Sequence, residues 1–151
     1  MSIYKTEKSH KLFERAKEVI PGGVFGHYKY AIRDKGPVFF SRSKEAHFWD
    51  IDDNEYIDYR LAYGPYILGY ADPRVDQAAR EGMEIGGVFA LATELEYEVA
   101  KKVSAMVPSA ELVRYSNSGT EAVMAALRVA RAYSKRDEFI MIEGGYHGVS
   151  D

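Results

Sequence analysis

Hydrophobic positions at the start of the chain follow a helical period and then change to strand patterns. Residues 9–20 carry apolar side chains three or four positions apart, which predicts an amphipathic helix. A Pro-Gly-Gly sequence ends it, because proline lacks an amide N–H and glycine accepts left-handed angles. Residues 37–40 are typical of a short strand, and residues 47–51 and 55–59 flank an Asp-Asp-Asn turn and predict a β-hairpin. A helix followed by a small antiparallel sheet is expected.

After Gly64-Pro65 the pattern changes to alternating helices and strands. Asp72 is a helix N-cap followed by proline, and it opens a helix to about Met83. Thr93 and Glu96 have the spacing of a capping box and predict the start of the next helix, which Pro108 ends.

The last forty residues read as strand, helix and strand. Residues 111–115 and 139–142 are the expected strands, and a helix starts at Ser118. Its expected buried face consists of Val123, Ala126, Leu127, Ala130 and Tyr133. A βαβ unit implies a parallel sheet and an α/β fold class. We expect residues 1–64 to belong to a small domain and residues 65–151 to begin a larger one. The alternative is a single small complete domain.

Composition excludes several classes of function. The chain has 151 residues, 46% of them hydrophobic, a net charge of −3 and no cysteine. The absence of a basic run argues against nucleic-acid or anionic-membrane partners, and the absence of cysteine excludes disulfides and thiolate metal sites. Neither a signal peptide nor a long apolar run is present, so we expect a cytoplasmic protein.

The segment from Tyr115 to Ala122, which reads YSNSGTEA, is a candidate anion site. A strand is expected to lead into a helix start there, where free amide N–H groups and the helix dipole favour negative charge. Gly119 lets an anion approach the backbone, and Ser118 and Thr120 add hydroxyl donors; a phosphate monoester fits this set. The alternative is a plain capping box of Ser118 and Glu121 that binds nothing.

A second motif, Gly-Gly-Tyr-His-Gly at residues 144–148, follows the next expected strand. Ligands of parallel α/β sheets bind beyond the C-terminal strand ends, so this loop and the Ser118 helix start are expected on the same edge. There Tyr146 can stack on a flat heteroaromatic ligand. The alternative is a tyrosine packed in an ordinary turn.

Together these motifs resemble the cofactor motifs of the class III aminotransferases, and in particular of members similar to glutamate-1-semialdehyde aminomutase. Similar strings occur along nearly the whole chain: IPGGV at 20–24, WDID at 49–52, YIDY at 56–59, Gly64-Pro65 with Leu68-Gly69, and VPS at 107–109. The resemblance implies the fold-type-I pyridoxal-phosphate (PLP) transferase fold and a homodimer. It also implies that the chain is an N-terminal part.

The resemblance also implies roles for individual residues. Ser118, Gly119 and Thr120 would hold the cofactor phosphate, Tyr146 would lie over the pyridine ring, and His147 belongs to the same cofactor-binding set. The lysine that forms the Schiff base lies, in the family, beyond Asp151, so no catalytic residue is expected here and the chain alone is expected to be inactive.

Substrate residues differ from those of the aminomutases. Gly26, Lys29 and Tyr63 stand where these enzymes typically have serine, arginine and tryptophan. Lysine lacks the two-pronged carboxylate contact of arginine, which favours an aminotransferase acting on an amino acid or amine and a keto acid. The aminomutase reaction stays the alternative, and a non-catalytic PLP- or phosphate-binding module or degenerate subunit is the non-enzyme alternative.

A metal site is not expected. Asp50, Asp52 and Asn54 resemble the start of a calcium loop, but Glu55 and Leu61 stand where that loop needs glycine and glutamate. The hairpin turn is the better interpretation, with Asn54 rather than Asp53 in the left-handed conformation. The four histidines lack metal-ligand spacing.

Overall fold

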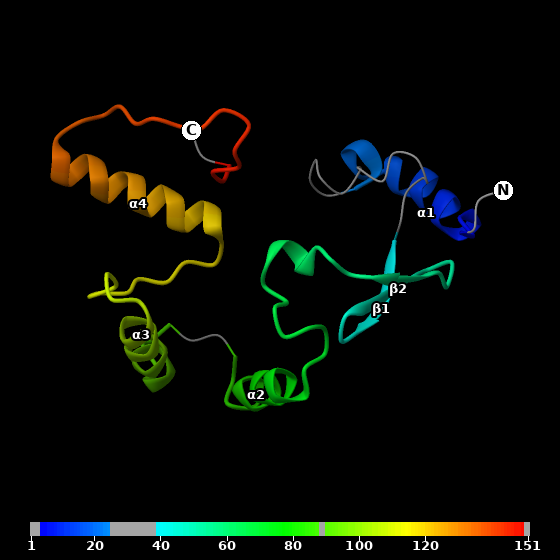
Figure 1. Cartoon of the computed structure of the whole chain (residues 1–151), viewed down its shortest axis with the longest axis horizontal. Helices are drawn as coiled ribbons and strands as arrows, with labels where there is room; N and C mark the ends of the chain where they lie inside the picture. Colours follow the sequence, from blue (N-terminus) through cyan, green and yellow to red (C-terminus); the bar gives the residue numbers. More distant parts are fainter. Residues whose placement is uncertain (1–3, 25–38, 88–89, 150–151) are drawn as a thin grey trace. The chain divides into compact units, whose positions relative to one another are not determined.

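The computed structural model describes residues 4–24, 39–87 and 90–149, which fall into two compact units, Met1–Gly87 and Val88–Asp151 (Figure 1). The first unit contains helix α1 (Glu7–Lys17), the 3-10 turn η1 (Pro21–Gly23), a three-stranded sheet, the turn η2 (Leu61–Tyr63) and helix α2 (Pro73–Glu84). The second contains helices α3 (Glu94–Met106) and α4 (Gly119–Ser134). Along the chain, the division between the units falls after helix α2 and before helix α3. The domain boundary expected after residue 64 stays a prediction.

The N-terminal helix is confirmed, two residues earlier at its start than its pattern suggests. α1 ends at Lys17, and the Pro-Gly-Gly sequence forms η1. Gly23 has a φ of +75°, and a Cβ there would lie 2.6 Å from the Phe13 ring, so this turn packs directly on the helix. Glycine is therefore needed at position 23 for both its angle and its size.

The hairpin is confirmed as part of an antiparallel sheet in the order β1 (Phe40–Lys44), β2 (His47–Asp50) and β3 (Glu55–Ile57). The expected first strand begins at residue 37, but residues 37 and 38 lie outside the described part of the chain. In the β2–β3 turn Asp53, with a φ of +64°, takes the left-handed conformation, so the expectation for Asn54 is wrong. Asn54 keeps a negative φ because both its backbone and its side chain are bound to Asp50.

Aromatic rings form a ladder across one face of this sheet. Tyr4 stacks on Tyr56 at 5.2 Å between ring centroids, and Tyr56 stacks on its cross-strand partner Phe48 at 4.8 Å. Phe40 and Tyr70 continue the row. Such pairs stabilise a sheet beyond the area they bury. The ladder accounts for part of the high tyrosine content.

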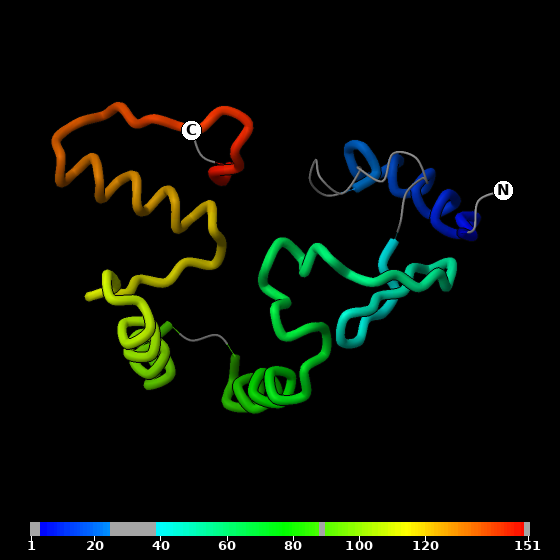
Figure 2. Tube along the Cα trace, viewed as in Figure 1, coloured from blue at the N-terminus to red at the C-terminus, as the bar shows by residue number. Residues whose placement is uncertain are grey.

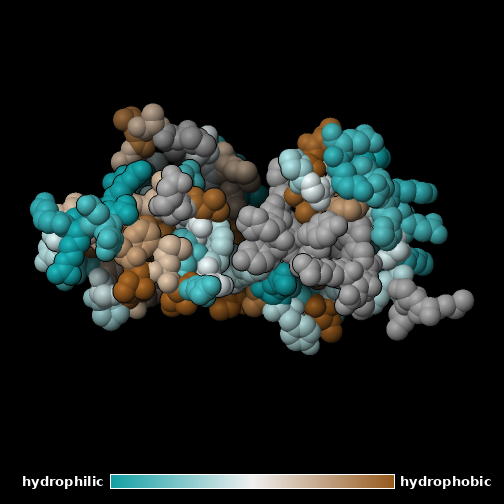
Figure 3. Space-filling model, turned by 90° about the horizontal axis from the view of Figure 1, so that it is seen from above, coloured by the Kyte–Doolittle hydropathy of each residue, from teal (hydrophilic) through white to brown (hydrophobic). Residues whose placement is uncertain are grey.

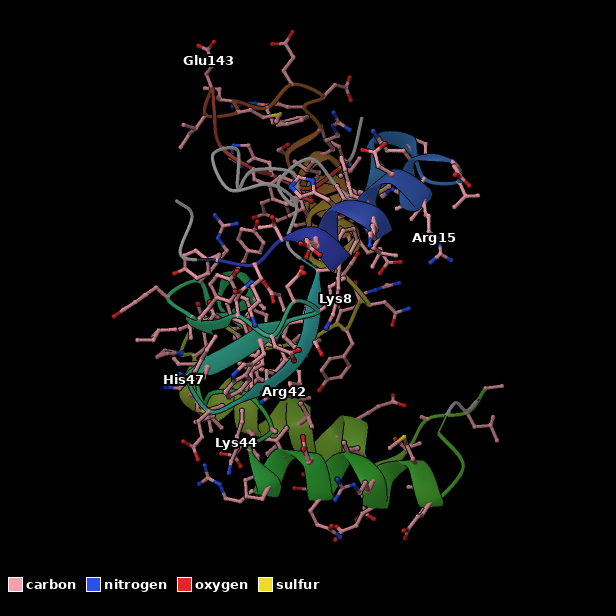
Figure 4. All side chains as sticks on the ribbon, turned by 90° about the vertical axis from the view of Figure 1, so that its right-hand side faces the viewer. Lys8, Arg15, Arg42, Lys44, His47 and Glu143 are labelled. Atoms are coloured by element: carbon pink, nitrogen blue, oxygen red, sulfur yellow. The ribbon has the colours of Figure 1, made fainter. Side chains whose placement is uncertain are left out.

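Carboxylates of the β2–β3 turn fasten α1 to the sheet. The Asp52 side chain accepts hydrogen bonds from the backbone N–H groups of Lys8 at 2.7 Å and Ser9 at 2.8 Å. Asn54 adds two bonds to the backbone of Lys5. The α1 cap residue, Thr6, makes no side-chain bond to the helix, so Asp52 satisfies the free amides in its place. Lys8 lies at the end of α1 nearest the sheet (Figure 4).

This contact is expected to weaken in acid. Burial raises the pKa of Asp52, but hydrogen bonds from Ser9 and Lys8 outweigh it and hold the pKa below its usual value. A lowered folded-state pKa stabilises the fold above the unfolded value of about 3.9, and that stability is lost as pH falls further. Pulse-labelled hydrogen exchange of residues 4–17 in the full-length protein should therefore show loosening below about pH 4. Asp52→Asn should remove this pH dependence and Asp53→Asn should leave it; an identical acid response in all three proteins would contradict the assignment.

The two helices predicted after residue 64 are confirmed. α2 starts at the Asp72 cap, whose side chain accepts from the Arg74 amide at 2.9 Å. α3 starts after Thr93, whose amide donates to Glu96 Oε1 at 3.1 Å, as the capping box predicts.

The predicted parallel strands do not form in the described structure. Residues 111–115 and 139–142 belong to no sheet, and no residue of α4 is buried; Leu112, Tyr133 and Ile140 are 95%, 91% and 99% exposed. A strand needs a partner for its backbone groups, and these two segments do not pair with each other. Ala16 is the one buried hydrophobic residue among those described, and brown hydrophobic side chains lie at the surface in Figure 3.

Candidate functional site

The start of α4 presents two backbone N–H groups without a protein partner in the described part of the chain. The cap is a complete capping box: Ser118 Oγ accepts from the Glu121 amide at 3.2 Å, and Glu121 Oε2 accepts from the Ser118 amide at 3.0 Å. The Ala122 amide donates to the Ser118 carbonyl. Of the four amides that begin a helix, those of Gly119 and Thr120 are left over. The predicted capping box is present, and it leaves these two backbone donors free beside it.

The surroundings of these two amides suit an anion. Gly119 is exposed, and a Cβ added to it would meet no atom within 4 Å, so the space beside its backbone is open. The Glu121 carboxylate is held in the capping box. The hydroxyls of Ser118 and Thr120 each keep a proton to donate.

The Gly144–Gly148 loop lies against this helix start. After α4 the chain runs back alongside the helix and ends near its first turn (Figure 2). The Val149 amide donates to Thr120 Oγ1 at 3.1 Å. The two sequence motifs, 29 residues apart at this contact, are therefore brought together as predicted, although no parallel strands support them in the described structure.

The loop closes on itself through its histidine. His147 Nε2 lies 3.2 Å from the Ile142 carbonyl oxygen, which also accepts from the Gly145 amide at 3.1 Å. A Cβ at Gly145 would lie 2.7 Å from His147 Nε2, so the imidazole packs over that glycine. His147 is thus bound within the loop, while Tyr146 is 63% exposed.

A cavity of about 430 Å³ adjoins the capping box. It is lined by Arg114, Tyr115, Ser116, Asn117, Glu121, Met124, Ala125 and Arg128. Arg114 and Arg128, whose guanidinium groups bring positive charge to this cavity, were not predicted from the sequence. The spacing of Glu121, Ala125 and Arg128 on one face of a helix was the available signal.

Tyr63, a predicted substrate residue, lies in the first unit on a left-handed turn. Leu61, Ala62 and Tyr63 have φ values of 51°, 49° and 67°, a run that costs energy for residues other than glycine. Arg60 Nη1 donates to the Tyr63 hydroxyl at 3.1 Å. Lys29, the other predicted substrate residue, lies outside the described residues, as does Gly26.

The Asp58 carboxylate is hydrogen-bonded to the start of this left-handed turn. It accepts from the amides of Arg60 at 2.7 Å and Leu61 at 3.2 Å and from the Tyr70 hydroxyl at 2.6 Å. Burial raises the pKa of Asp58, but these hydrogen bonds, with that of Tyr70 first, keep it below its usual value. The bond to Asp58, together with burial, raises the pKa of Tyr70 to about 12. The Asp58 carboxylate therefore stays ionised at neutral pH, and its hydrogen bonds to the turn offset part of the backbone strain.

The described residues contain neither a metal-binding cluster nor a membrane-spanning helix. No cluster of acidic and histidine side chains there is arranged to hold a metal ion. The carboxylates of Asp50 and Asp52, which resemble a calcium loop in sequence, are instead bonded to amides and to Tyr56. No described helix has the length and apolar character needed to cross a membrane.

Solved structures similar to this chain include two transaminases. A transaminase with PLP bound superposes with a TM-score of 0.90 and 38% identity, over 97% of this chain and 34% of that one. An omega-transaminase from Sphaerobacter thermophilus matches at 0.87 and 38% identity, over 93% and 32%. The chain therefore has the N-terminal portion of the fold-type-I PLP-dependent transferase fold, as predicted.

The family follows from the sequence match. Residues 30–151 match the model of the family described as aminotransferase class-III, and the chain belongs to that family. A glutamate-1-semialdehyde 2,1-aminomutase 2 of Listeria monocytogenes serotype 4a is 49% identical over 152 residues, which cover all of this chain and 35% of that protein. The chain spans about a third of the length of the curated relatives it matches.

Proposed function

We propose that the full-length protein is a PLP-dependent enzyme that transfers an amino group between an amino compound and a keto acid or aldehyde. The observation that carries the proposal is the pair of unpartnered Gly119 and Thr120 amides with the Tyr146 loop bonded to the same helix turn. PLP has a phosphate and a flat ring, and this arrangement offers donors for one and an aromatic side chain for the other.

Each residue in this proposal has a defined task. The Gly119 and Thr120 amides and the hydroxyls of Ser118 and Thr120 bind the phosphate. Tyr146 stacks on the ring, and His147 keeps the loop that carries it closed through the Ile142 carbonyl. The cofactor supplies the electron-withdrawing ring that the protein then orients. The Schiff-base lysine lies outside this chain, so this chain alone does not catalyse the reaction.

The domain organisation and assembly complete the proposal. Residues 1–64 contribute to a small domain and residues 65–151 begin the PLP-binding domain. The family resemblance favours a homodimer, and we propose a cytoplasmic location for it.

Tyr63 and Lys29 favour the aminotransferase over the aminomutase. Tyr63 is fixed on its strained turn and its hydroxyl is already bonded to Arg60. Lys29 provides a point charge where a two-pronged carboxylate clamp needs arginine. The second candidate, glutamate-1-semialdehyde 2,1-aminomutase, is favoured by the 49% identical relative.

Assays of the full-length protein with both substrate classes decide between the two. We expect amino transfer from an amino acid or amine to a keto acid, and aminomutase turnover at least about tenfold lower, because one lost charge-assisted contact is worth about 1.5–3 kcal/mol. Lys29→Arg with Tyr63→Trp should raise the aminomutase rate without raising amino transfer.

Two outcomes would contradict the proposed aminotransferase function. Efficient conversion of glutamate-1-semialdehyde to 5-aminolevulinate without an external amino acceptor would assign the aminomutase reaction. Failure of the purified full-length protein to retain PLP would remove both enzymatic proposals.

A further inference from the structure

The Gly144–Gly148 loop meets α4 at one closely packed point. Gly148 has a φ of +92°, and a Cβ there would lie 3.1 Å from both Cα and Oγ1 of Thr120. The next amide, that of Val149, donates to the same Oγ1 atom at 3.1 Å. The loop backbone therefore rests on the Thr120 side chain, and glycine at 148 makes this approach possible.

At its beginning, the loop is closed by contacts to the Ile142 carbonyl oxygen. Gly145 and His147 both bond to the Ile142 carbonyl oxygen, so the turn from Ile142 to His147 is closed. Tyr146 lies within this closed turn, two residues before the Gly148 contact with Thr120. A change at Thr120 releases one of the two ends that determine where the tyrosine ring lies.

The chemistry of a hydroxyl group allows Thr120 to serve both motifs at once. A threonine hydroxyl has two acceptor lone pairs and one proton. One lone pair receives the Val149 N–H, and the proton stays available for an anion at the free amides of Gly119 and Thr120. Hydrogen bonds linked through one group strengthen each other, so an anion bound there also strengthens the hold on the loop.

We propose that Thr120 is the positioning residue that holds the Tyr146 loop against the helix start, so that phosphate binding and ring stacking are coupled through one hydroxyl. The proposal rests on the proposed cofactor-binding function, which it extends by a connection between two subsites. It assigns to Thr120 a role beyond that of a phosphate ligand.

Hydrogen exchange tests the contact without any cofactor. In the full-length protein we expect the Val149 amide to exchange roughly fivefold faster in Thr120→Val, which has the same shape but no hydroxyl, and at the normal rate in Thr120→Ser. Gly148→Ala keeps the hydroxyl but places a Cβ against Thr120, so it should also speed the exchange. Overlapping peptides that isolate Val149, analysed by mass spectrometry, give these rates. Unchanged exchange in Thr120→Val would overturn the proposal.

A double-mutant cycle with Tyr146 tests the coupling. Thr120→Val should weaken PLP binding roughly tenfold or more, and Thr120→Ser should restore it. If Thr120 positions Tyr146, part of this loss disappears when Tyr146→Ala is already present. Loss factors that simply multiply would make Thr120 a phosphate ligand alone and overturn the coupling.

The two failures are distinguishable. If the unaltered protein binds no PLP, the proposed function is wrong and the coupling proposal falls with it, whereas the Val149 exchange rates still decide whether Thr120 holds the loop.

Discussion

Replacement of Asp50 by asparagine is expected to destabilise the N-terminal unit by roughly 2–4 kcal/mol, because it leaves buried donors unsatisfied. Asp50 is 1% exposed, and its carboxylate accepts four hydrogen bonds, from the amides of Asp52 and Asn54, the Asn54 side chain and the Tyr56 hydroxyl. The amide nitrogen of an asparagine at position 50 would face donors that now face an oxygen. The turn that carries the Asp52 cap of α1 depends on these bonds.

Asp53→Asn is the matched control. Asp53 has the same charge and lies three residues away, but its side chain is 72% exposed and forms an ion pair with the exposed Lys8 at 3.4 Å. Exposed pairs contribute little, so a change within about 0.5 kcal/mol is expected. Hydrogen exchange of residues 4–17 and 47–57 in the full-length protein gives both values. Equal effects of the two substitutions would show that the Asp50 network does not hold this unit together.

Local sequence signals predicted the elements that local contacts form. The capping boxes at Thr93 and Ser118 and the Asp72 cap depend on residues two or three positions apart, and all three are present. The role of Asp52 could not be found in this way, because its partners are 43 and 44 residues away. The sequence pattern Asp-x-Asp-x-Asn resembled a metal loop, and the structure uses the same oxygens to cap a helix and close a turn.

Two predicted strands have no pairing partner in the described structure. Residues 111–115 and 139–142 have apolar patterns suitable for a sheet. Periodicity indicates which residues share a face, but it does not indicate which segment pairs with them. The same limit applies to α4, which has the expected apolar face but no buried residue in the described structure. The site depends less on these strands, because the Thr120–Val149 bond joins its two motifs directly.

Residue types predicted which residues form the candidate site, but they did not predict the hydrogen bonds that join those residues. A strand leading into a helix start predicts free amides, but which two remain follows from the capping box of Ser118 and Glu121. That box was itself the alternative to a phosphate site, and in the structure it leaves the amides of Gly119 and Thr120 free beside it. His147 was placed with the cofactor residues by resemblance; in the structure its ring contacts the Ile142 carbonyl oxygen of its own loop.

Replacement of Gly119 by alanine is expected to lower PLP affinity at least tenfold without lowering stability. Replacement of Asp50, in contrast, is expected to lower stability. Gly119 is the first residue of α4, its φ is not left-handed, and an added Cβ would meet no protein atom within 4 Å. Alanine is a better helix former than glycine, so the fold should be unchanged or slightly more stable. The open space beside the backbone is where we propose that the phosphate binds, and a methyl group there obstructs it; a loss of 1.4 kcal/mol is a factor of about ten.

Gly82→Ala is the control for glycine removal in a helix. Gly82 lies inside α2, where an added Cβ also meets no atom within 4 Å, so alanine should stabilise the helix by about 0.5–1 kcal/mol and leave PLP binding unchanged. PLP titration and thermal melting of the full-length variants, each with and without cofactor, measure both quantities. Because the Gly119 variant should melt normally without PLP and gain less stability from it, binding and folding are separated in one experiment. A Gly119→Ala protein with unaltered PLP affinity would place the phosphate away from this backbone and leave Ser118 and Glu121 as a helix cap only.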